Sequence, residues 1–141
     1  TGALVRGSGA TLACLDWPLC NGSALPFDQG QLETVHMMHR YAVAALGLTL
    51  ALLVWYVYQA RSDSLVRMLS VAALIAYFAQ AAVGALFVLT EAAPIWGATH
   101  VGLAATTWAL LVGVCTIDTM NSQENKATEW SPQSEPERAA R

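Results

Sequence analysis

The chain has 141 residues, of which 55% are hydrophobic and 12% are charged, and its formal net charge at pH 7 is -3. A soluble globular domain carries about 25% charged residues, so this composition excludes an ordinary soluble domain and indicates an integral membrane protein. The small net charge and the lack of a basic cluster also exclude nucleic acid as a partner.

Residues 1–32 come before the first long apolar stretch and contain Cys14 and Cys20 on either side of a Trp-Pro turn. Three interpretations of this pair are open: a disulfide, two free thiols, or part of a metal site. An oxidising compartment preserves disulfides, whereas a structural zinc ion needs four nitrogen or sulfur ligands, which this segment does not supply. We therefore expect a disulfide in an extracytoplasmic loop. Cys115, in a later apolar stretch, is interpreted as a packing residue.

Three stretches without charged side chains follow, and each is about as long as the roughly 20 apolar residues that span a bilayer. They cover residues 41–60, 68–90 and 93–117. We predict an all-α integral membrane bundle over residues 33–117, with helices at about 33–60, 67–90 and 93–117. Residues 118–141 are polar and lack apolar periodicity, so they predict a disordered tail.

The basic residues of the connections predict the orientation of these helices. The first connection carries Arg61 and Arg67, whereas the second, around Glu91, carries no basic residue. Loops rich in Lys and Arg stay on the cytoplasmic side. We therefore expect a multi-pass protein of the cell membrane, with the cysteine-containing loop outside the cytoplasm and the C-terminal tail inside. Arg6 and Arg40 lie on the outer side and oppose this orientation.

Ionisable side chains gather where the first long helix begins. Glu33, His36 and His39 recur at every third residue, so they form a winding stripe on one broad helix face. His100 lies about 9 Å into the third long helix, at a depth similar to that of His39. Imidazoles at matched depth suit the two axial positions of a haem iron, and Arg40 could pair with a haem propionate. Alternatively, these histidines are solvated at the membrane interface or hydrogen-bonded among the helices.

Four segments resemble the haem A synthase family. They are "TGALVRGSGATLACLDWPLCNG" at 1–22, "HR" at 39–40, "QAAVGALFVL" at 80–89 and "THVGLA" at 99–104. The first segment is the most specific, and the histidine motifs occur in the right order. The resemblance covers residues 1–117, which is the whole chain except the tail.

The resemblance implies a membrane oxidoreductase that oxidises a methyl group of haem O to the formyl group of haem A, for the assembly of cytochrome oxidase. It implies His39 and His100 as ligands of a haem iron, with haem b as cofactor and haem O as substrate. It implies that Cys14 and Cys20 are an extracytoplasmic pair, structural or active in a redox relay. It also implies Glu33 as the acidic residue near the haem.

The chain departs from the family pattern Glu-x-x-His-Arg. Three positions before His39 the chain has His36, and the acidic residue lies one turn further back at Glu33. Either Glu33 reaches the site, or His36 takes a proton-transfer or ligand role, so both are candidate catalytic residues. The following Arg40 favours His39 over His36 as the ligand.

Size is a second departure. Full-length members of the family contain two similar four-helix halves, and this chain resembles one half without its first helix. A second half is therefore expected, as another copy in a homodimer or as a different unit, although a truncated sequence would give the same pattern. The other expected partners are membrane lipid, haem O synthase and the cytochrome oxidase assembly.

Two further functions stay open on the sequence. One is a membrane haem-binding or electron-transfer cytochrome that oxidises no methyl group. The other is an extracytoplasmic thiol redox module that works through Cys14 and Cys20.

Overall fold

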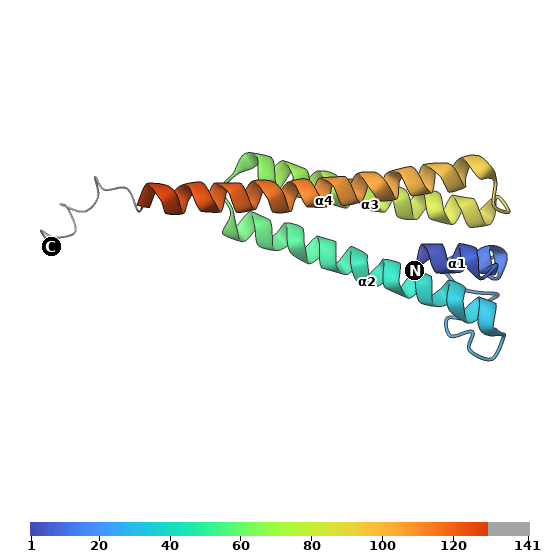
Figure 1. Cartoon of the computed structure of the whole chain (residues 1–141). Coiled ribbons are helices and arrows are strands. Elements are labelled where there is room, and N and C mark those ends of the chain that lie inside the picture. The colour runs from blue at the N-terminus through green and yellow to red at the C-terminus, as the bar shows by residue number, and fades with distance from the viewer. Residues whose placement is uncertain (130–141) are drawn as a thin grey trace, which may run out of the picture.

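The computed structural model describes residues 1–129, and its regular elements are all helices (Figure 1). Two short helices lie near the N-terminus, and three long ones follow: α1 (Gly2–Gly7), η1 (Ala10–Leu12), α2 (Gln31–Ala60), α3 (Ser64–Leu89) and α4 (Pro94–Glu129). Each long helix is long and apolar enough to cross a membrane. Residues 1–129 contain no strand, only an isolated bridge between Cys20 and Ser23. The predicted all-α membrane bundle is confirmed.

The local sequence explains where the long helices begin. Gly30, with a φ of 146°, precedes α2 and adopts a backbone conformation that other residues rarely reach. Asp63 caps α3 by accepting a hydrogen bond from the backbone N–H of Val66 at 2.9 Å. Pro94 is the first residue of α4, where a missing backbone N–H costs nothing. As a result, α2 and α3 begin two or three residues before the predicted positions.

The long helices pack together most tightly where α2 passes into α3. Val57, Val66 and Val114, one from each long helix, form a buried cluster there. α3 and α4 run side by side, whereas α2 diverges from them toward its N-terminal end, where α1 lies against it (Figure 1). We call the closely packed end the Arg61 end, after the residue that follows α2. We call the opposite end the loop end.

A glycine lets α2 and α3 approach each other between these two ends. A Cβ atom on Gly47 would lie 2.9 Å from the ring of Tyr77, which is closer than real Cβ contacts allow. The Tyr77 hydroxyl donates a hydrogen bond to the backbone carbonyl of Val43. This polar group inside an apolar bundle therefore has a partner, as buried polar groups require.

The structure corrects the predicted end of the last helix. α4 continues to Glu129, beyond the predicted end at residue 117. The reason is tertiary contact: Arg61 Nε lies 2.5 Å from Asp118 Oδ1, and the Asn121 amide donates to Asp63 Oδ2 at 2.9 Å. Polar residues that suggested a tail are thus held against the α2–α3 connection. The rest of the predicted tail, residues 130–141, lies outside the described residues.

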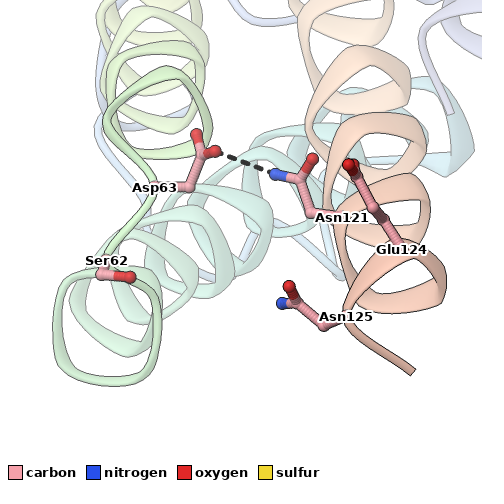
Figure 2. Close-up of a pocket in the computed structure, with 5 residues that line it drawn as sticks. All are labelled: Ser62, Asp63, Asn121, Glu124 and Asn125. Carbon is pink, nitrogen blue, oxygen red and sulfur yellow. Dashed lines mark hydrogen bonds between the residues drawn. The ribbon is translucent and has the colours of Figure 1, made fainter. Parts of the chain in front are cut away.

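A polar pocket opens beside these contacts at the Arg61 end. Figure 2 shows the residues that line it: Ser62, Asp63, Asn121, Glu124 and Asn125. None of these residues is a histidine or a cysteine. The pocket lies at the Arg61 end, whereas the histidines and the cysteine pair lie at the loop end.

Candidate functional site

The expected disulfide between Cys14 and Cys20 is present. Cys14 and Cys20 are joined by an S–S bond of 2.01 Å, and both residues are fully buried, in a cluster with Met37 of α2. Within residues 1–129 no group of three or more His, Cys, Asp or Glu side chains could hold a bare metal ion. The cysteine pair is therefore part of the packed core at the loop end.

The loop around this disulfide, residues 13–22, is called the disulfide loop below. Its shape depends on Asp16, whose carboxylate accepts hydrogen bonds from the backbone N–H groups of Asn21 at 2.5 Å and Gly22 at 2.9 Å. Both donors have positive φ, 50° at Asn21 and 80° at Gly22, as Asn and Gly tolerate. The hydrogen bond from the N–H of Gly22 is the largest cause that lowers the pKa of Asp16 below its ordinary value.

Two side chains of α2 fasten the disulfide loop to the helix. The guanidinium of Arg40 donates to the backbone carbonyls of Pro18 at 3.3 Å, Cys14 at 3.5 Å, and Leu19. The backbone N–H of Cys14 donates to Nδ1 of His36 at 3.4 Å, and Nε2 of His36 lies 3.5 Å from Arg40 Nη2. His36 is only 4% exposed. Both nitrogens of the His36 ring therefore have polar neighbours.

Glu33 lies in the first turn of α2 and is partly exposed. Its carboxylate folds over Gly30, because a Cβ atom on Gly30 would lie 2.5 Å from Glu33 Oε2. This position, at the N-terminus of a helix, favours a negative charge. Within the described residues, the carboxylate makes no hydrogen bond to a histidine.

His39 lies one turn from the loop contacts and faces the N-terminal segment. The hydroxyl of Thr1 lies 2.8 Å from His39 Nδ1, and Gly2 leaves space beside the ring, because a Cβ there would lie 3.5 Å from Cε1. Among residues 1–129, Nε2 of His39 has no hydrogen-bond partner. His39 is half-buried.

His100 of α4 is oriented by α3. Its Nδ1 lies 2.9 Å from the backbone carbonyl of Gln80. A carbonyl oxygen can only accept, so Nδ1 carries the proton, and in the neutral ring Nε2 has the free lone pair. Nε2 has no hydrogen-bond partner in the described part of the chain. A metal-binding histidine is held in this way, with its other N–H on a carbonyl or carboxylate.

The structure brings His39 and His100 to the same end of the bundle. His39 lies near the N-terminal end of α2 and His100 near the N-terminal end of α4, and both helices begin at the loop end. His36 and Arg40, by contrast, are used in contacts with the disulfide loop. The loop end thus holds two histidines that each have Nδ1 engaged and, among residues 1–129, no hydrogen-bond partner for Nε2.

Sequence reasoning did not single out Gln80 or Gly84 as residues of the site. Gln80 contributes through its backbone, which no side-chain pattern reports. A Cβ atom on Gly84 would lie 3.0 Å from the ring of His100. The sequence signal that could have pointed to these two residues is Gly84 one helical turn after the polar Gln80, inside an otherwise apolar stretch.

Together, the three long apolar helices define an all-α membrane protein, and two histidines lie at the loop end of its bundle. The family model for "Cytochrome oxidase assembly protein" (COX15-CtaA) matches residues 1–112. The chain belongs to this family.

Curated relatives agree with the family. The Heme A synthase of Symbiobacterium thermophilum is 37% identical over 116 residues, which are 81% of this chain and 37% of that protein. The Heme A synthase of Shouchella clausii is 37% identical over 91 residues, or 64% of this chain and 30% of that protein. The chain thus spans about a third of the length of these relatives. No solved structure matches it.

Proposed function

We propose that this chain is a haem-binding unit of a haem A synthase, an oxidoreductase that converts the methyl group of haem O to the formyl group of haem A. The observation that carries the proposal is the pair His39 and His100 at the loop end of the bundle. Each has Nδ1 engaged, and Nε2 has no hydrogen-bond partner in the part of the chain that the structure describes. Family membership supports the same function.

The donor set fits a haem rather than a bare metal ion. A haem iron already has its porphyrin nitrogens and needs only two axial ligands from the protein, whereas a bare ion needs more. His39 and His100 would hold the iron of haem b, or of haem O as substrate, through Nε2. When bound, the haem iron supplies the electron transfer that oxidation of a methyl group requires.

The other candidate residues have different parts in this proposal. His36 and Arg40 position the disulfide loop over the site, because their polar atoms meet the backbone of that loop. Glu33 is the proposed proton carrier, since its carboxylate is partly exposed at the loop end and is free of ion pairs within residues 1–129. Arg40 also remains a proposed partner for a propionate, as a guanidinium suits a carboxylate.

A second unit would complete the enzyme. The chain spans about a third of the length of its curated relatives, and α2 diverges from α3 and α4 at the loop end (Figure 1). We propose that another copy, or a different half, packs there. Haem O synthase and the cytochrome oxidase assembly are the proposed partners in the cell. The disulfide loop would be extracytoplasmic and the C-terminal end of α4 cytoplasmic.

The proposal is tested by expressing the full chain together with a source of haem O, purifying it, and analysing the extracted haem. We expect haem A in the wild-type sample, and at least a tenfold loss of bound haem in His39→Ala and His100→Ala, since each removes an axial ligand. Thr106→Ala is the matched control, because the exposed Thr106 hydroxyl bonds only to the carbonyl of Gly102 in its own helix.

Each other result of this experiment contradicts the proposal in a recognisable way. Haem B alone, with the histidine variants still losing it, would indicate an electron-transfer cytochrome. Activity that needs Cys14 but survives His100→Ala would indicate a thiol redox module. The full burial of both sulfur-bearing residues opposes that module, because thiol exchange needs access to a sulfur atom.

A further inference from the structure

The contact between His100 and α3 is made to a backbone carbonyl that already has a partner. In an α-helix the carbonyl of Gln80 accepts the N–H of the residue four positions later, which is Gly84. The Nδ1 atom of His100 lies 2.9 Å from the same oxygen. A carbonyl has two lone pairs, so it can accept both hydrogen bonds, provided that nothing covers its outer side.

Gly84 leaves that outer side open. A Cβ atom at this position would lie 3.0 Å from Cε1 and 3.1 Å from Nδ1 of His100. These separations are tighter than ordinary van der Waals contact, so any side chain at residue 84 would push the ring away from the Gln80 carbonyl. The absence of a side chain therefore allows the imidazole to lie directly against the backbone of α3.

We propose that Gly84 and the backbone carbonyl of Gln80 are positioning elements that fix the tautomer and the direction of the His100 ring. The carbonyl accepts a hydrogen bond from Nδ1–H, and the glycine gap lets the ring approach. Nε2 is then unprotonated, and it lies farther than Nδ1 from the position of a Cβ atom on Gly84. This inference rests on the proposed function, in which Nε2 of His100 binds the haem iron. Loss of such a partner typically weakens metal binding about 10- to 100-fold.

The test uses a graded series at one glycine and a matched series at another. Gly84→Ala adds a methyl group against the ring, and Gly84→Val adds a branched side chain. Gly102→Ala and Gly102→Val are the controls, because Gly102 lies in the interior of α4 and a Cβ there meets nothing within 4 Å. Both series make the same change in helix propensity, so they differ chiefly in contact with His100.

Two readouts separate the inference from the proposed function. Nitrogen NMR of the haem-free full chain, labelled at histidine, reports the His100 tautomer. We expect the Nδ1–H form in wild type and both Gly102 variants, a mixture in Gly84→Ala, and loss of the preference in Gly84→Val. In haem-loaded protein we expect Gly84→Val to bind haem about tenfold more weakly, with a shift from a six-coordinate to a five-coordinate iron spectrum.

The inference is overturned when the Gly84 series matches the Gly102 series in both the tautomer and the haem spectrum. If wild type binds no haem, the proposed function fails, but the tautomer measurement still decides the role of Gly84. Should Gly84→Val fail to fold, as judged by gel filtration and circular dichroism, Gly84→Ala carries the test. An unchanged tautomer in that variant then refutes the inference.

Discussion

Asp16 illustrates how single polar residues hold the loop end together. Its carboxylate lies inside the disulfide loop and accepts hydrogen bonds from the backbone N–H groups of Asn21 and Gly22. The side chain of Asn21 adds a further bond to the carbonyl of Ala13, at 3.1 Å. These bonds add to the disulfide and to the contacts of Arg40 in holding the loop. The disulfide loop in turn covers His36, so the stability of the loop affects how firmly His36 is held.

A pH dependence follows from the lowered pKa of Asp16. The unfolded carboxyl has the model value of 3.8, and the folded pKa is lower. The carboxylate therefore stabilises the folded loop fully above the unfolded pKa, and this contribution is lost as the pH falls through the folded pKa. Protonation of a water-soluble phosphine slows its attack on any disulfide at low pH, so each rate is divided by that of an unstructured disulfide peptide. On this relative scale we expect Cys14–Cys20 to be reduced faster at pH 3 than at pH 6.

Asp16→Asn should speed that reduction at pH 6 by about fivefold, equivalent to about 1 kcal/mol for charge-assisted bonds at a solvated site, and should remove most of the pH dependence. Asp28→Asn is the control, because Asp28 is exposed and makes no hydrogen bond among residues 1–129. Equal rates for the two variants at pH 6 would show that Asp16 does not hold the loop.

At the scale of helices, contacts between elements hold α4 in helical form beyond residue 117. Apolar length predicts three helices, because each crossing needs about the same number of residues. Apolar length cannot predict the ion pair between Asp118 and Arg61. The two residues are far apart in sequence, and their contact depends on the packing of α4 against α2 and α3. A polar residue that would favour the end of an isolated helix can lie inside a helix when its charge has a partner, as Asp118 does here.

The ion pair between Arg61 and Asp118 should therefore stabilise the Arg61 end modestly. The side chains are 39% and 30% exposed, and ion pairs that are this exposed contribute little to stability. The carboxylate of Asp118 also raises the pKa of Arg61, so the arginine is charged at every accessible pH. We expect Asp118→Asn to lower the thermal unfolding temperature in detergent by a few degrees at most.

The exchanged double variant Arg61→Asp with Asp118→Arg tests whether the pair itself matters. It should recover part of the stability that either single variant loses, which a double-mutant cycle reports as a favourable coupling between the two residues. Additive losses, with no recovery, would mean that the pair is a consequence of the α4 extension and contributes nothing to it.

For the whole molecule, the sequence predicts features that depend on composition and on short spacing. These include the membrane helices, the family, and the disulfide between Cys14 and Cys20. Matched depth along two helices also predicts His39 and His100 at the same end. The contacts of His36 and Arg40 with the disulfide loop were not predicted, because loop backbone carbonyls leave no mark in the residue pattern. The Gly84 gap depends likewise on where α4 lies.

The orientation in the membrane is a property of the whole chain and gives the last prediction. Arg61, Arg67 and Lys126 lie at the Arg61 end, and the guanidinium of Arg67 lies 5.3 Å from the ring centre of Tyr58, an interfacial arrangement. Arg6 and Arg40 are the basic side chains at the loop end, and the guanidinium of Arg40 is held by loop carbonyls. The balance of basic residues therefore still favours a cytoplasmic Arg61 end.

Single cysteines introduced in a Cys115→Ser background can test this orientation in intact cells with a membrane-impermeant maleimide. Asp28→Cys at the loop end should be labelled directly, because Asp28 is exposed. Ser62→Cys, in the connection after α2, should be labelled only after the cells are permeabilised. The Cys115→Ser background alone is the control and should stay unlabelled, because Cys14 and Cys20 are joined. The reverse pattern would place the disulfide loop in the reducing cytoplasm, where a pair of cysteines would not persist as a disulfide.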